Sequence, residues 1–276
     1  MNASGAMNVI AIDTPWSRAT ISLFGAQVLS FVPAGEEDLL WMSPAPLPPP
    51  AAIRGGVPLC WPWFARQNVP ATAVQHGPAR ISEWRVVSQR LNGGGEPELM
   101  MRPVEPLDPM SVELMITVGR SLRISLTTVN EDRVPRTLTQ ALHTYLRVTD
   151  AERAVVAGLD GLPYIDSRQG GAPARQQGDI DPPVALDRIY HGFAGDPAVS
   201  VVDRDARRTL TVSAEGSRSV VVWNPGEALA AGMKDVPGDS WRGFVCVEAA
   251  NAGPDRRELA PGQSHRLTQT LSVRRH

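Results

Sequence analysis

The sequence predicts an all-β protein, a large antiparallel β-sandwich formed by a single domain over residues 1–276. Many short segments alternate apolar and polar residues, and a period of two is typical of a half-buried strand. Glycine and proline, 24 and 25 residues, interrupt these segments at short intervals, as in sandwiches and barrels. No amphipathic helical stripe exceeds about two turns; Glu227–Lys234 is the nearest candidate.

The expected strands share β-branched and aromatic residues as well as alternation. In Leu122–Thr127, for example, an apolar residue occupies every second position. The segments with this pattern include Asn8–Ile12, Ala19–Phe24, Val112–Val118, Leu122–Val129, Val199–Asp203, Ser219–Asn224 and Leu267–Val273.

Three polar or proline-rich segments are expected to be loops. Ser43–Pro50 contains five prolines and cannot form an interior strand. Asn92–Gly95 predicts a hairpin loop, and Gln169–Pro183 a long polar excursion. Strand patterns resume on both sides of each segment, which favours one continuous domain over two.

The charge balance argues against nucleic acid as a partner. The net charge is −2 and the isoelectric point about 6.2, so no global basic field attracts polyanions. The chain has 27 lysines and arginines, of which Lys234 is the single lysine and the other 26 are arginines. With arginine used so generally, an arginine suggests anion binding only within a motif.

Cys60 and Cys246 stand in apolar surroundings and have no metal-ligand spacing, so we expect buried free thiols and no metal site. The N-terminus lacks the pattern of a secretory signal, and no run of 18 apolar residues occurs. We therefore expect a cytoplasmic monomer without a membrane partner.

Ile53–Arg80 is the segment whose composition best fits a ligand site. Arg54 and Arg80 bracket a stretch rich in glycine, proline and aromatic residues, and Gln75-His76 precedes the second arginine. Glycines allow close backbone approach, and arginines offer forked donors for oxyanions. Trp61 and Trp63 in this segment, and Trp84 just beyond it, offer flat apolar walls for a ligand. This chemistry suits a polar, anionic small molecule.

Two further residues stand out because they interrupt apolar strand-like runs. His143 lies within Leu138–Leu146, and Glu248 ends the apolar run that begins at Gly243. Each alone is also compatible with a structural role, and their separation of 105 positions does not show that they meet. If they do, a negative Glu248 favours a protonated His143, whereas burial favours the neutral ring.

These residues and motifs resemble, in the same order, those of the hexose-6-phosphate mutarotases of the aldose 1-epimerase superfamily. The motifs are Arg54-Gly55-Gly56-Val57-Pro58, Cys60-Trp61-Pro62, Gln75-His76-Gly77, Ala79-Arg80, His143-Thr144-Tyr145 and the strand with Glu248. The resemblance extends from about Val9 to Val273. It implies a galactose-mutarotase-like β-sandwich, no cofactor, and interconversion of the α and β anomers of a hexose 6-phosphate.

The resemblance also implies roles for individual residues. His143 matches the catalytic histidine of these enzymes and Glu248 their catalytic glutamate. The positions that match substrate-binding residues are Arg54, Gln75, His76, Arg80 and Asp187. Ala249-Ala250 replaces the usual Pro-Gly after the glutamate, Ala65 stands where glycine is common, and Pro78 replaces a bulkier apolar residue. These departures concern substrate preference more than the reaction.

Three other functions remain open from the sequence. A mutarotase for unphosphorylated aldoses shares the histidine and glutamate but does not need the arginines. A non-catalytic carbohydrate-binding protein on the same scaffold needs neither catalytic residue. A glycoside hydrolase normally requires two carboxylates that flank the scissile bond, and Asp187 is the single candidate for the second.

Overall fold

The computed structural model describes residues 8–276, and their strands pair antiparallel in two large and two small sheets. This architecture confirms the predicted all-β sandwich. The helical content is a single short α-helix, α1 (Gly226–Ala230), with four 3₁₀ turns at 79–81, 167–169, 238–243 and 253–255 among the described residues. None of these helices is long and apolar enough to cross a membrane.

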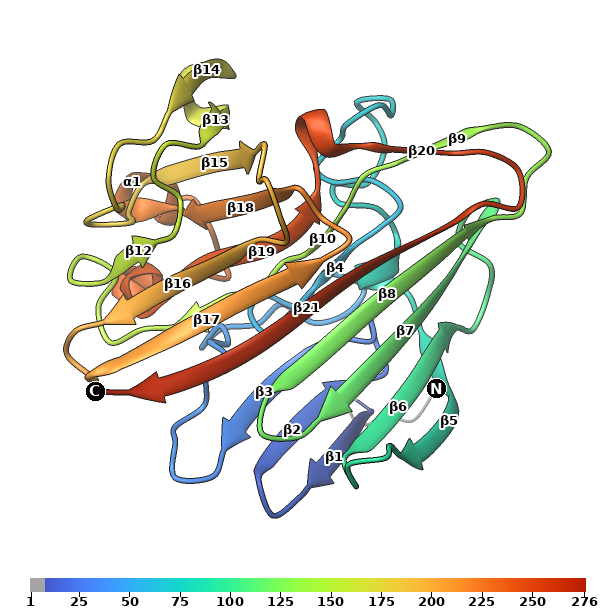
Figure 1. Cartoon of the computed structure of the whole chain (residues 1–276), viewed down its shortest axis with the longest axis horizontal. Helices are drawn as coiled ribbons and strands as arrows, with labels where there is room; N and C mark the ends of the chain where they lie inside the picture. The colour runs from blue at the N-terminus through green and yellow to red at the C-terminus, as the bar shows by residue number, and fades with distance from the viewer. Residues whose placement is uncertain (1–7) are drawn as a thin grey trace.

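The first large sheet carries two of the candidate site residues, Asp187 and Glu248. Its strands, in spatial order, are β14 (Ala172–Arg175), β13 (Pro163–Asp166), β15 (Leu186–His191), β18 (Ser219–Asn224), β19 (Phe244–Asn251), β10 (Gln140–Leu142) and β4 (Leu59–Cys60), with β11 (Tyr145–Arg147) also paired to β19. In Figure 1, β15, β18 and β19 lie one after another above β16 and β17.

The second large sheet forms the other layer. Its strands, in spatial order, are β12 (Val155–Ala157), β16 (Ala198–Asp203), β17 (Arg208–Glu215), β21 (Ser264–Arg275), β8 (Leu122–Asn130), β7 (Met110–Val118), β6 (Pro97–Pro103) and β5 (Trp84–Leu91). β19 of the first sheet contacts β17 and β21 of the second. The buried apolar side chains of both sheets form one core between them.

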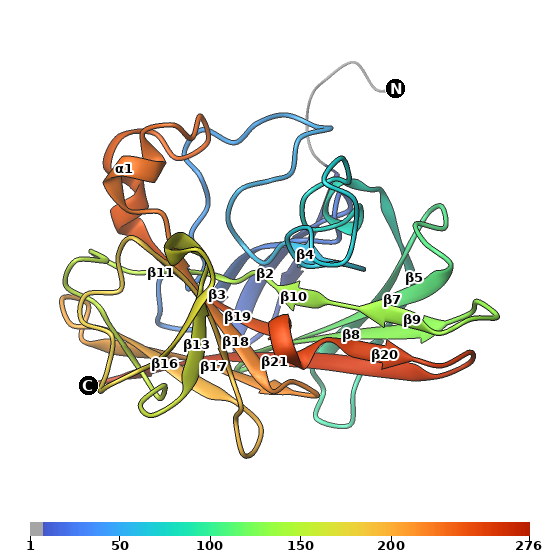
Figure 2. The ribbon, with the colours of Figure 1, turned by 90° about the horizontal axis from the view of Figure 1, so that it is seen from above.

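The two small sheets complete the architecture. One contains β1 (Val9–Asp13), β2 (Ser17–Ser22) and β3 (Val28–Pro33), and the other pairs β9 (Arg136–Leu138) with β20 (Arg257–Leu259). Seen from above, the blue and cyan loops near β4 and the helix α1 lie on one side of the first sheet. β16, β17 and β21 lie on its other side (Figure 2).

The segments predicted from alternation all contain strands, and only their ends differ. Leu23 and Phe24 fall outside β2, while β21 extends far beyond the expected seven residues. The prediction that Gln169–Pro183 is a loop throughout was wrong. Its first part contains β14, a fully exposed edge strand that pairs with β13 and so lacks the buried face that produces alternation. The short helix ends at Ala230, before the expected Lys234.

Glycine is required at position 56, where the chain leaves the Arg54 motif. Gly56 has φ of +60°, and a Cβ atom there would lie 2.2 Å from the carbonyl oxygen of Val28. We expect Gly56→Ala to lower the free energy of unfolding by about 3 kcal/mol or more, since strain and overlap add. Gly35→Ala is the matched control, because φ is +79° but nothing lies within 4 Å. If urea unfolding shows equal losses of unfolding free energy in Gly56→Ala and Gly35→Ala, the overlap with Val28 does not contribute to the loss.

Candidate functional site

The candidate residues gather in a cleft of about 410 Å³ on one face of the first sheet. Strand alternation selects this face: Ile189, Val221 and Glu248 line the cleft, while their neighbours Tyr190, Val220 and Val247 pack into the core. The residues lining the cleft are Arg54, Phe64, Ala65, Gln67, Gln75, His76, His143, Ser167, Asp187, Ile189, Val221, Trp223, Leu229, Met233 and Glu248.

His143 and Glu248 meet in this cleft although 105 residues separate them. Oε1 of Glu248 lies 3.2 Å from Nδ1 of His143, and both side chains are buried. The contact lacks the alignment of a hydrogen bond. Glu248 lies within β19, not at its end, and His143 lies between β10 and β11. An acid–base pair is thus present in a single pocket.

Burial decides the resting charges of this pair. It raises the pKa of Glu248 well above its ordinary value; the neighbouring Asp187 raises it further, and Arg80 opposes the rise. Burial also lowers the pKa of His143 well below its ordinary value, as do His76, Arg80 and Arg54. Burial therefore favours the neutral form of both groups.

Aromatic rings hold the imidazole of His143 in place. The ring of Tyr145 stacks on it nearly in parallel, with centroids 4.9 Å apart and planes 8° apart. The rings of His76 and Trp223 meet it edge-on, at centroid distances of 5.7 and 5.9 Å. The orientation of the imidazole is therefore fixed from three sides.

Arg54 enters the cleft from the loop that follows the proline-rich segment. Its Nε donates to Oδ2 of Asp235 at 2.9 Å, and its Nη1 donates to the hydroxyl of Tyr145 at 3.0 Å. Burial alone would lower its pKa, but Tyr145 and Asp235 outweigh burial and raise it. The guanidinium is thus positively charged and anchored, and Nη2 has no partner among residues 8–276.

Gln75 and His76 belong to a loop that closes on itself between Trp61 and Gly77. The amide of Ala65 donates to Nδ1 of His76 at 3.1 Å, so a neutral ring carries its proton on Nε2. Nε2 lies 3.3 Å from the amide nitrogen of Gln75; with the proton on Nε2, the two side chains hydrogen-bond only if the Gln75 amide is turned to present its oxygen. Burial, assisted by Arg80 and Arg54, lowers the pKa of His76 to about 3. His76 is therefore a neutral hydrogen-bonding group in the cleft.

Asp187 supplies a second carboxylate to the cleft lining. It lies in β15 directly across from Trp223 in β18. Its pKa is raised by burial and by Asp166, while a hydrogen bond with Ser167 lowers it. The backbone amide of Arg168 donates to Asp166, an N-terminal cap that holds the 3₁₀ turn beginning at Ser167 beside Asp187.

Arg80 differs from the other predicted binding residues. It is buried, does not line the cleft, and its Nε has no hydrogen-bond partner. Its charge nevertheless affects the pKa values of Cys60, His76, His143 and Glu248. Arg80 is thus a buried cation close enough to the cleft to affect these residues through its charge, although it is not among the lining residues.

The tryptophans proposed as walls for a ligand lie elsewhere. Trp61 and Trp84 are buried in the core, where their ring nitrogens donate to Thr128 and to the carbonyl of Ala79. Trp63 lines a separate, smaller hollow. The aromatic wall of the cleft is Trp223, which the sequence analysis missed. Trp223 stands two residues after Val221, so both side chains lie on the same face of the strand. The sequence does not reveal that this face is the one that lines the cleft.

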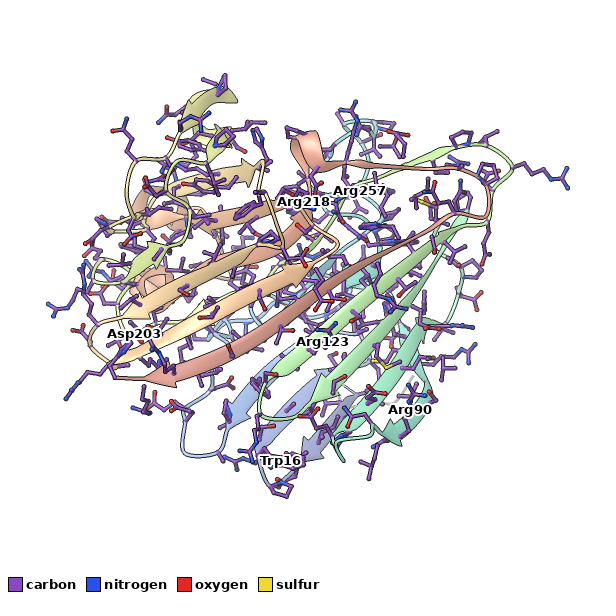
Figure 3. All side chains as sticks on the ribbon, in the orientation of Figure 1. Trp16, Arg90, Arg123, Asp203, Arg218 and Arg257 are labelled. Atoms are coloured by element: carbon purple, nitrogen blue, oxygen red, sulfur yellow. The ribbon has the colours of Figure 1, made fainter. Side chains whose placement is uncertain are left out.

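A larger hollow lies on the outer face of the second sheet, about 500 Å³, but its chemistry is different. It contains no histidine, and its arginines are largely paired, Arg90 with Glu98 and Arg123 with Glu215. Both arginines are labelled on this face in Figure 3. Residues 8–276 hold no group of three or more His, Cys, Asp or Glu side chains placed to bind a metal.

The cysteines play no part in the cleft. Cys60 and Cys246 are free and fully buried, as predicted. Burial raises the pKa of both thiols, so neither is a reactive thiolate.

Comparison with known proteins agrees with this fold. The family model for aldose 1-epimerase matches residues 8–272. A protein from Escherichia coli K12 named "Putative glucose-6-phosphate 1-epimerase" is 35% identical over 97% of this chain and 90% of its own length. One of the same name from Salmonella typhimurium LT2 is 34% identical, with the same coverage.

Solved structures extend the match to three dimensions. A crystal structure described as a putative mutarotase from Salmonella typhimurium superposes with a TM-score of 0.88 at 29% identity, covering 99% of this chain and 92% of that one. The cleft, the fold and the sequence match all point to one assignment. The chain belongs to the aldose 1-epimerase family.

Proposed function

We propose that this chain is a mutarotase that interconverts the α and β anomers of a hexose 6-phosphate such as glucose 6-phosphate. The observation that carries the proposal is the contact between His143 and Glu248 in a cleft that also holds the charged Arg54. The names of the relatives from Escherichia coli and Salmonella typhimurium support the choice of substrate.

The reaction needs one acid and one base at a single carbon. Ring opening removes a proton from the C1 hydroxyl and delivers one to the ring oxygen; rotation about C1–C2 and closure then give the other anomer. Each well-placed group contributes about 10²–10⁴-fold. We assign Glu248 as the base toward the C1 hydroxyl and His143 as the acid toward the ring oxygen, with the roles reversed on closure.

The neutral resting pair is compatible with these roles. A neutral His143 with a protonated Glu248 contains as many protons as the ion pair, and the two forms differ by one proton transfer across 3.2 Å. The field of Arg80 favours the carboxylate form of Glu248. In our proposal the ion-paired form reacts, so the site needs neither a redox step nor a covalent intermediate.

The remaining residues are assigned to binding. Arg54 presents its unpartnered Nη2 to the phosphate as a charge-assisted donor. Gln75, His76 and Asp187 bind the sugar hydroxyls. Arg80 is assigned to the field at the acid–base pair and not to direct phosphate contact, because it does not line the cleft.

Trp223 is proposed as the apolar wall for the sugar ring. Trp223→Ala is expected to raise KM about five- to tenfold with a smaller change in kcat, because the variant loses apolar contact but no acid or base. Trp16→Ala is the control, because Trp16, labelled at the lower end of the molecule in Figure 3, does not line the cleft. A fall in kcat with KM unchanged would contradict this role.

An anomerisation assay by polarimetry or exchange NMR tests the function. Freshly dissolved single anomers of glucose 6-phosphate and of glucose are compared, with His143→Ala as the inactive control. Higher kcat/KM on the phosphorylated sugar is expected. Equal values favour a mutarotase for plain aldoses, and no activity on either sugar favours a non-catalytic carbohydrate-binding protein.

A further inference from the structure

Tyr145 contacts both ends of the proposed site. Its ring stacks face to face on the imidazole of His143, with planes 8° apart. Its hydroxyl accepts a hydrogen bond from Nη1 of Arg54 at 3.0 Å. The side chain is fully buried, so neither contact competes with water. One rigid ring therefore joins the arginine of the cleft to the imidazole.

The backbone fixes Tyr145 to the same loop. Its amide donates to the carbonyl of Gly56, whose own amide donates to the carbonyl of Trp41; the amide of Trp41 donates back to the carbonyl of Tyr145. The rings of Trp41 and Phe244 pack against Tyr145 as well, at centroid distances of 5.8 and 5.1 Å. The ring can therefore not move independently of the loop that bears Arg54.

We propose that Tyr145 is a positioning residue that couples anion binding at Arg54 to the orientation of the catalytic His143. This inference rests on the proposed function. It adds that phosphate at Arg54 is sensed by the acid–base pair through the stacked ring, so that a phosphorylated sugar gains in kcat as well as in binding.

The geometry gives the two parts of Tyr145 separate tasks. The hydroxyl completes the anchoring of Arg54, together with Asp235. The ring face sets the plane of the imidazole, and small errors in the placement of a catalytic group are costly. A variant without the hydroxyl therefore loses the coupling, whereas a variant without the ring loses the orientation of His143.

Two variants separate these tasks. For Tyr145→Phe, kcat/KM on glucose 6-phosphate is expected to fall about tenfold, with much of the loss in kcat, and the loss on glucose is expected to be smaller. For Tyr145→Leu, kcat is expected to fall about 30-fold or more on both sugars, and the pH profile of kcat to shift. Tyr164→Phe is the control, because Tyr164 lies in β13 outside the cleft lining.

The outcomes are decisive in both directions. A selective fall in kcat on the phosphorylated sugar in Tyr145→Phe supports the coupling, and a loss confined to KM contradicts it. Equal losses on the two sugars in Tyr145→Phe, or no loss at all, overturn it. An inactive wild type on both sugars would instead refute the proposed function, so the two failures are distinguishable. Near-ultraviolet circular dichroism of Tyr145→Phe, expected to retain the wild-type fold, excludes unfolding as the cause.

Discussion

Replacing Glu248 by glutamine is expected to lower kcat on glucose 6-phosphate by about 10³-fold or more, with KM changed much less. The amide has nearly the same shape as the carboxyl group but cannot accept the proton of the C1 hydroxyl. His143 would keep its ring stacking on Tyr145, so the loss would report on the base alone. Exchange NMR between anomers measures it. Substantial retained activity would contradict the assignment.

The same substitution is expected to stabilise the fold at neutral pH. Because burial raises the pKa of Glu248 in the folded protein, the folded state keeps a proton that the unfolded chain releases above about pH 4.5. Stability of the wild type is thus lost as pH rises from that value toward the raised pKa. Glu248→Gln lacks this loss, and we expect its Tm to exceed that of the wild type by about 2 °C or more at pH 8, with little difference near pH 4.

Asp203→Asn provides the opposite pattern as a control. Asp203, labelled at the left edge of Figure 3, is buried and pairs with buried Arg208 at 3.4 Å. Removal of one partner leaves an uncompensated charge and is expected to cost about 3 kcal/mol of stability, with activity retained because the pair lies outside the cleft lining. If Glu248→Gln lowers Tm as much as Asp203→Asn does, burial of the Glu248 carboxyl group does not destabilise the fold.

Replacing Arg54 by glutamine is expected to remove the preference for phosphorylated sugar. The charge-assisted contact from Nη2 to phosphate is lost, so kcat/KM on glucose 6-phosphate should fall about 10²-fold, while glucose is affected only a few-fold. The change also leaves Asp235 without its cation. A negative charge there adds repulsion toward phosphate and none toward glucose, which widens the difference between the sugars.

Arg123→Gln controls for a general loss of positive charge. Arg123 pairs with Glu215 on the outer face of the second sheet, and both sugars should be converted at wild-type rates. If Arg54→Gln lowers kcat/KM equally on the two sugars, Arg54 does not select the phosphate. Raising the ionic strength should weaken the wild-type preference in the same direction as the substitution, because salt screens the contact.

Most of the strands could be predicted, because a half-buried strand alternates apolar residues that face the core with polar residues that face solvent. Leu122–Asn130 alternates buried and partly exposed side chains without interruption, and the sequence shows the same period. β14 was missed because all four of its residues are exposed. An edge strand without a buried face has no apolar period for a sequence to display.

The members of the site could be named from the motif resemblance, but their arrangement could not. Arg80 was expected to bind substrate but is not among the residues that line the cleft, while Trp223 lines it and was not named. Trp61 and Trp84 have the right chemistry for a sugar platform, yet both are core residues. Residue type does not reveal which face of a strand looks into a cleft.

The sequence by itself determined the all-β class, the lack of a polyanion-binding field and the identity of an unusual histidine and glutamate. Only the tertiary structure decided that Nδ1 of His143 and Oε1 of Glu248 lie 3.2 Å apart, and that burial makes the neutral forms of both the favoured ones. The physical reason is that alternation is a local property of each strand. Strand order in the first sheet, with β19 between β18 and β10, depends on packing summed over the whole chain.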